Sequence, residues 1–132
     1  MPTFSNISLE RLSQVHPDLQ TLFHEVIKHS DCSIISGVRT DEEQQELYAK
    51  GRTEDGEIVT YKDGIVNKSR HQLGRAVDAA PYPINWKDTD RFRAFGWFVK
   101  DIAKSLKRDG KIDYDITWGG DWKWKDFAHF EI

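Results

Sequence analysis

The chain has 132 residues, of which 38% are hydrophobic and 31% are charged, and this length fits one domain, spanning 1–132, with a buried core. Its 19 basic and 22 acidic residues leave a net charge of −3 without a basic run, which argues against a nucleic-acid partner. The only cysteine, Cys32, excludes an internal disulfide and a cysteine-rich metal site.

Two helices are predicted at the start of the chain. Ser8 is expected to cap a short first helix, and Pro17 suits the first position of a second one. The second helix should run to about Lys28 or His29. Its apolar residues recur at steps of three and four, which predicts a stripe that faces the core: Leu19, Leu22, Phe23, Val26 and Ile27.

A strand and a third helix should follow. The β-branched segment 32–39 predicts the strand, and Thr40 and Glu43 stand at the spacing of a capping box. The helix that begins there should end at Gly51, which can adopt the left-handed conformation of a C-terminal cap. The polar segment 52–68 is predicted to be a long loop, with at most a small hairpin, and loops of this length are often functional.

The second half predicts a strand, a long helix and two short strands. Segment 76–80 is small and apolar enough for a buried strand, and 88–108 has a clear apolar face with Gly110 as its stop. Segments 116–122 and 127–132 should form two strands joined by a turn. We therefore predict an α+β fold in which helices flank a short, mainly antiparallel sheet.

Asp78 is an unusual residue inside the predicted strand, because a buried carboxylate is unfavourable unless it is paired or bound to a metal. His71 precedes it, before a turn at Gly74, and His129 lies in the last predicted strand. Hydrolytic zinc sites take three protein ligands, and both imidazole nitrogen and carboxylate oxygen are suitable. Any one of these residues alone is more often structural, so the zinc hypothesis rests on His71, Asp78 and His129 together.

Asp126, three residues before His129, is the proposed general base, which would take a proton from water and pass it to a leaving amine. This role requires the chain to bend between the two residues. Taken in isolation, an aspartate such as Asp126 is more often a solvated turn residue. Ser69 and the Gly119-Gly120 turn could add hydrogen bonds to a substrate.

Arg39 lies at the end of a predicted strand, where sites tend to form. Its forked donors could stabilise an oxyanion or bind a substrate carboxylate. The alternative is a surface ion pair with Asp41 or Glu42, which would contribute about 0.2 to 1 kcal/mol.

Other histidines and aromatic residues have simpler interpretations. His24 and His29 lie five residues apart and so about 140° apart around a helix, which prevents them from sharing a metal. His16 is expected to be a helix-entry residue. Three tryptophans could form a sugar platform, although core and rim positions are the favoured interpretation: Trp118, Trp122 and Trp124.

These motifs resemble the M15 family of zinc peptidases, through Ser69-x-His71-x-x-Gly74-x-Ala76-x-Asp78 and Asp126-x-x-His129. The segments 36–40 and 118–122 also resemble family blocks, so the likeness extends over nearly the whole chain. It implies Zn²⁺ bound by His71, Asp78 and His129, a base at Asp126, an arginine near the substrate at Arg39, and the peptidoglycan stem peptide as substrate. Ala128 stands where the endopeptidase members are expected to have proline.

Within that family, the chain most resembles the phage endolysins that cleave L-alanyl-D-glutamate bonds. The alternatives are a D-alanyl-D-alanine dipeptidase or carboxypeptidase, and a zinc-containing wall-binding module without activity. No export signal and no run of about eighteen apolar residues is visible, so we expect no membrane anchor. We expect a monomer made in the cytoplasm that reaches the cell wall after pore-dependent release.

Overall fold

A computed structural model describes residues 2–65 and 67–132. Its four strands form one antiparallel sheet in the order β1-β2-β4-β3. The strands are β1 (Cys32–Ser36), β2 (Ala76–Pro81), β3 (Thr117–Trp118) and β4 (His129–Glu131). With the helices around it, this sheet confirms the predicted α+β class.

Helices α1 (Asn6–Leu12) and α2 (Pro17–Val26) confirm the two predicted at the start of the chain. The predicted cap of α1 is wrong, because Ser5 caps the helix and Ser8 lies inside it. Ser8 is buried, and its hydroxyl accepts a hydrogen bond from the backbone N–H of Ile34 at 3.0 Å, which joins α1 to β1. Pro17 does begin α2, after His16 as its N-cap.

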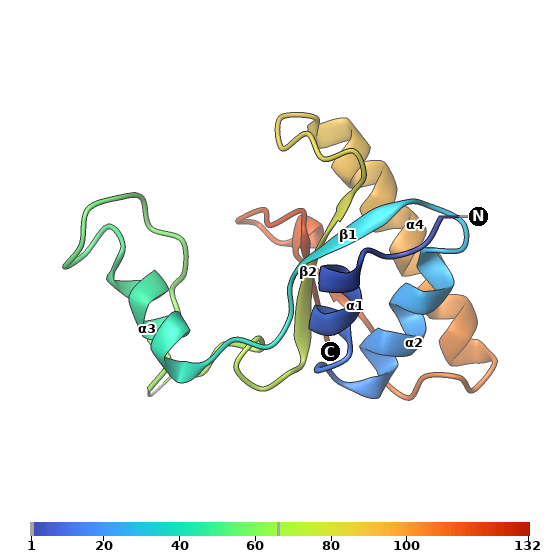
Figure 1. Cartoon of the computed structure of the whole chain (residues 1–132), viewed down its shortest axis with the longest axis horizontal. Helices are drawn as coiled ribbons and strands as arrows, with labels where there is room; N and C mark the ends of the chain where they lie inside the picture. The colour runs from blue at the N-terminus through green and yellow to red at the C-terminus, as the bar shows by residue number, and fades with distance from the viewer. Residues whose placement is uncertain (1, 66) are drawn as a thin grey trace.

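Helix α3 (Asp41–Ala49) begins with the predicted capping box, in which Thr40 and Glu43 hydrogen bond reciprocally. Residues 52–65 and 67–68 include no strand, so the suggested hairpin is absent from this part of the loop. The suggestion also included Val66, which lies outside the described residues. Helix α3 and the loop extend away from the sheet and the other helices (Figure 1).

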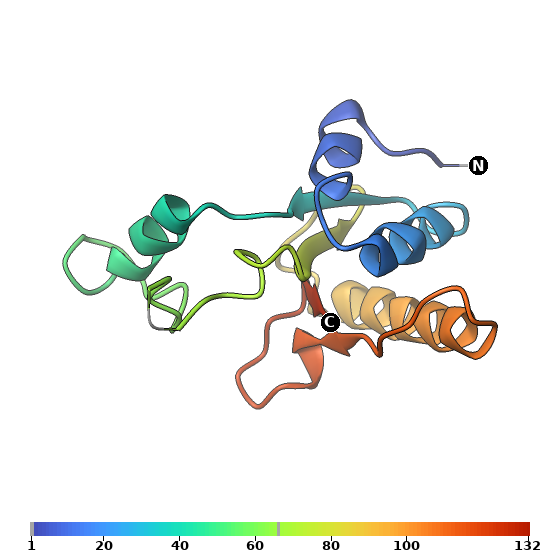
Figure 2. The ribbon, with the colours of Figure 1, turned by 90° about the horizontal axis from the view of Figure 1, so that it is seen from below.

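The core lies between one face of the sheet and the helices α2 and α4 (Thr89–Arg108), which pack against each other (Figure 2). Alternate residues of the strands point into it. The buried strand residues of this core are Cys32, Ile34, Val77, Ala79, Trp118 and Phe130. Asp78 and His129 lie between these positions in the strands, so their side chains lie on the opposite face.

Trp118 fixes the segment that leads toward Asp126. Its ring packs so closely against two glycines that a Cβ on Gly96 or Gly120 would lie only 2.2 Å or 2.1 Å from it. Its indole N–H donates to the Phe127 carbonyl at 2.8 Å. The short 3₁₀ helix η1 (Gly119–Asp121) is thus anchored to both α4 and the last loop.

Among the residues described, we find no helix with the length and apolar character needed to cross a membrane.

Candidate metal centre

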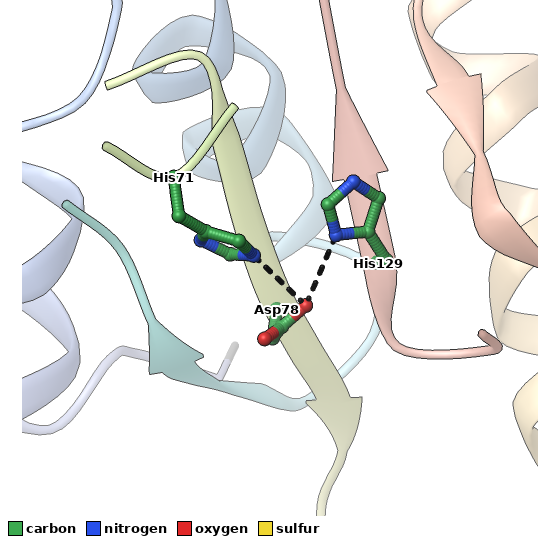
Figure 3. A group of neighbouring side chains, drawn as sticks. All are labelled: His71, Asp78 and His129. Carbon is green, nitrogen blue, oxygen red and sulfur yellow. Dashed lines mark ion pairs between the residues drawn. The ribbon is translucent and has the colours of Figure 1, made fainter. Parts of the chain in front are cut away.

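His71, Asp78 and His129 converge as predicted. Asp78 and His129 are directly paired across β2 and β4, which places both side chains on one face of the sheet. The Oδ1 atom of Asp78 lies 3.4 Å from Nε2 of His71 and 3.4 Å from Nδ1 of His129 (Figure 3). One donor atom from each residue lies within 4.8 Å of the other two.

His71 is held by the main chain around it. Its Nδ1 lies 2.9 Å from the Gly37 carbonyl, which leaves Nε2 to face Asp78. The His71 carbonyl accepts from the backbone N–H of Arg39 at 2.9 Å, and its own N–H donates to the Ser69 hydroxyl at 3.2 Å. Only 3% of His71 is exposed, so the imidazole has one defined orientation.

His129 is held by carboxylates instead. Its Nε2 lies 2.7 Å from Oε1 of Glu131, and its Nδ1 faces Asp78. Burial lowers the pKa of His129, but the contacts with Asp78 and Glu131 outweigh it and raise that pKa to about 9. The contact with His129 in turn lowers the pKa of Glu131.

Asp78 provides the test of whether these residues suit a metal. Among the residues described, Asp78 Oδ1 is the one buried side-chain nitrogen or oxygen atom that has no hydrogen-bond partner. Burial raises the pKa of Asp78, yet the two imidazoles outweigh it and hold that pKa well below its ordinary value. An ionised, buried oxygen that faces two imidazole nitrogens fits a divalent cation, because a cation would compensate the charge that burial leaves unsolvated.

Asp126 lies beside this group at the bend that its predicted role requires. The backbone N–H of His129 donates to the Asp126 carbonyl at 3.3 Å, and the Asp126 N–H donates to the Gly119 carbonyl at 3.0 Å. Gly119 must be glycine here, since a Cβ would lie 2.3 Å from the Asp126 carbonyl oxygen. Burial and then repulsion from Asp78 raise the pKa of Asp126, which suits a proton acceptor.

Arg39 faces the cavity above the three residues. Its Nη1 donates to Oε1 of Gln44 at 2.6 Å, whereas Asp41 accepts from Lys68 and Gln72, so the alternative of an Arg39–Asp41 surface pair does not hold. Burial lowers the pKa of Arg39, against the attraction of Asp78 and other carboxylates.

Gln44 was not identified as a site residue from the sequence. It is fully buried, in a helix that is otherwise rich in acidic residues. Its amide donates to the Thr60 hydroxyl at 3.1 Å and to the Lys62 carbonyl at 2.6 Å. One glutamine therefore orients Arg39 and also anchors the 52–68 loop. The sequence does not show which groups Gln44 contacts, because two of its partners lie in a loop whose position depends on the tertiary structure.

A cavity of about 370 Å³ opens over the candidate metal centre. It is lined by all six predicted site residues: Arg39, Ser69, His71, Asp78, Asp126 and His129. Further lining residues that the sequence did not single out for this cavity include Tyr61, Lys62, Arg70 and Glu131. Glu131 did have a sequence signal, since a residue two positions after His129 in a strand points to the same face.

The three tryptophans occupy core and rim positions. Trp118 is buried, Trp122 lies against His129 with ring centroids 5.1 Å apart, and Trp124 is 56% exposed at the cavity rim. Trp124 contacts Tyr61 of the 52–68 loop edge to face at 5.4 Å. The Gly119-Gly120 turn, in contrast, is buried against Trp118 and Asp126 and does not line the cavity, so its suggested role as a substrate contact is not supported.

Three ligand-type side chains, beside a second carboxylate at Asp126 and an arginine at Arg39, define the class of metallopeptidases with a single metal site. The chain matches the family described as "Phage L-alanyl-D-glutamate peptidase" over residues 2–132, and it belongs to that family. The resemblance inferred from the motifs is thereby confirmed.

Two relatives and one solved structure support this assignment. The chain is 36% identical over 116 residues to the peptidoglycan L-alanyl-D-glutamate endopeptidase CwlK of Bacillus subtilis, an alignment that covers 80% of this chain and 62% of CwlK. It is 31% identical over 135 residues to the L-alanyl-D-glutamate peptidase of Escherichia phage T5, covering 98% of this chain and 88% of that protein. The crystal structure of the Serratia marcescens L-Ala D-Glu endopeptidase ChiX superposes with a TM-score of 0.74 at 26% identity, covering 98% and 90% of the two chains.

Proposed function

We propose that this protein is a zinc-dependent peptidoglycan hydrolase that cleaves the L-alanyl-D-glutamate bond of the stem peptide. The single observation that supports it best is the buried Asp78 Oδ1, which accepts no hydrogen bond and faces His71 and His129, each at 3.4 Å, in a cavity that Asp126 also lines. Family membership supports the bond that is cut, because both curated relatives are named for it.

His71 Nε2, Asp78 Oδ1 and His129 Nδ1 would hold the zinc ion. When bound, zinc polarises a carbonyl and lowers the pKa of a coordinated water. Asp126 would take a proton from the attacking water and deliver it to the amine that leaves. Its raised pKa suits both transfers, since a base that is too acidic would hold the proton weakly.

Arg39 would donate hydrogen bonds to the carbonyl oxygen as negative charge develops, or to a carboxylate of the substrate. Gln44 would keep the guanidinium in place through its 2.6 Å hydrogen bond. The Ser69 hydroxyl already accepts from the His71 N–H, so its own proton is available for a substrate acceptor.

The cavity suits an extended acidic peptide. Cationic side chains from Arg39, Lys62 and Arg70 line it, and Tyr61 and Trp124 form an exposed aromatic pair at its rim. A stem peptide brings carboxylates at D-glutamate and apolar methyl groups at alanine, so both parts of the lining would find partners.

Product analysis on purified peptidoglycan tests this proposal. Zinc-loaded protein should create new N-terminal D-glutamate, detected by mass spectrometry, and chelation should abolish the product until zinc is restored. Released D-alanine would instead indicate a D-alanyl-D-alanine peptidase. Wall binding without any product would indicate a binding module and would overturn the assignment.

The chain would act as a single domain over residues 1–132 and as a monomer. We infer that it is made in the cytoplasm and meets the wall after another protein has opened the membrane. Protein produced inside bacterial cells should then leave them intact until their membrane is permeabilised, and lyse them afterwards.

A further inference from the structure

The two histidines of the metal centre are oriented by different means. His71 directs its Nδ1 to a backbone carbonyl, that of Gly37, at 2.9 Å. His129 directs its Nε2 to a side chain, Oε1 of Glu131, at 2.7 Å. A main-chain acceptor cannot be removed by substitution or rotate away, whereas a carboxylate can.

Glu131 is placed for this contact by the strand itself. It follows His129 by two residues in β4, so both side chains lie on the face that carries the metal centre. Its side chain is 20% exposed, and its second oxygen, Oε2, lies 3.5 Å from Nε of Arg70. Arg70 immediately precedes His71 in the chain, so one ion pair links the segments that contain the two imidazoles.

The hydrogen bond selects which nitrogen of His129 is available. A neutral imidazole has one N–H and one lone pair, and a carboxylate at Nε2 requires the N–H there. In the neutral form that can bind a metal, the lone pair is then on Nδ1, the atom that faces Asp78 at 3.4 Å. Without Glu131, the ring could place its proton on Nδ1 or turn about its side-chain bonds.

We propose that Glu131 is a positioning residue that holds His129 in the Nε2–H form and so presents Nδ1 to the metal, with Arg70 restraining Glu131. The inference rests on the proposed zinc site. A carboxylate behind a ligating imidazole also makes the ring a better donor, and the loss of such a partner commonly weakens metal affinity by about 10- to 100-fold.

Zinc affinity, measured by competition with a chromogenic chelator, tests the proposal without reference to turnover. Glu131→Ala should bind zinc about 10- to 100-fold more weakly than the unchanged protein. Glu131→Gln should lose less, because its amide oxygen can still accept from Nε2–H. Arg70→Gln should weaken binding only several-fold, since the ion pair at 3.5 Å acts through Glu131.

The chain offers a matched control in Glu25, whose Oε1 lies 3.3 Å from Nε2 of His29 on the exposed surface of the α2 region. Glu25→Ala removes the same kind of histidine–carboxylate contact far from the cavity and should leave zinc affinity unchanged. Circular dichroism of each variant without metal establishes that it is folded.

Long-range ¹H–¹⁵N spectra of the zinc-loaded protein give a second readout, which applies even if Glu131→Ala fails to fold. In the unchanged protein and in Glu131→Gln, His129 should be protonated at Nε2. A zinc-loaded protein with the proton on Nδ1, or a folded Glu131→Ala with unchanged zinc affinity, would overturn the inference. Failure of the unchanged protein to bind zinc would instead refute the proposed function, so the two failures are distinguishable.

Discussion

Asp126→Asn is the most direct test of the catalytic assignment, because the structure separates the role of the side chain from that of its backbone. The turn depends on main-chain bonds, from Asp126 to Gly119 at 3.0 Å and from His129 to Asp126 at 3.3 Å. The asparagine Oδ1 can still accept the hydrogen bond that the Ala128 backbone gives the carboxylate. The variant should therefore fold and bind one zinc ion as before.

The amide cannot accept a proton, so the loss should appear in kcat. General-base catalysis contributes about 10²- to 10⁴-fold, which at about 1.36 kcal/mol per factor of ten is about 3 to 5 kcal/mol of activation free energy. The assay is the rate of L-alanyl-D-glutamate cleavage in soluble muropeptides, with zinc content measured on the same samples.

Asp121→Asn is the matched control, because Asp121 lies in the same region, is half-exposed, and pairs with Lys100 at 2.5 Å away from the cavity. It should retain the rate of the unchanged protein. Full activity in Asp126→Asn, with zinc bound, would refute the base assignment. Loss of zinc in that variant would show that Asp126 acts as a ligand instead.

Four further results are expected. His71→Ala should lose stoichiometric zinc by elemental analysis, while His24→Ala should keep it; zinc retained by the first would exclude His71 as a ligand. Gln44→Met should keep zinc but lower kcat/KM about 10- to 100-fold, because Arg39 and the 52–68 loop lose three hydrogen bonds; unchanged kinetics would show that neither needs Gln44. Metal removal should lower the melting temperature, since zinc is held only by the folded protein. Zinc binding at pH 7.5 should release about one proton, because the metal-free protein keeps His129 protonated up to a pKa of about 9. Affinity should accordingly rise from pH 7 to 9, and calorimetric heats that do not depend on the buffer's ionisation enthalpy would contradict this reasoning.

Local sequence patterns were sufficient for most of the fold. Three predicted features depend only on interactions between residues close in sequence, and the structure confirms them. They are the capping box at Thr40, the proline at the start of α2 and the apolar face of α4. The cap of α1 was missed because Ser5 and Ser8 are both acceptable caps, and only the contact of Ser8 with β1 decides between them.

The three donor side chains could also be found from the sequence, since a charged residue inside an apolar strand and a histidine before a glycine turn are local anomalies. The sequence alone thus indicated the three candidate ligands and the two strands that hold Asp78 and His129. Only the tertiary structure decided their partners: the register that sets Asp78 opposite His129, the buried Gln44 that joins Arg39 to a distant loop, and the Glu131–Arg70 pair behind His129. The physical reason is that hydrogen bonds and ion pairs between distant segments depend on distances of a few ångströms, which packing sets and residue spacing does not encode.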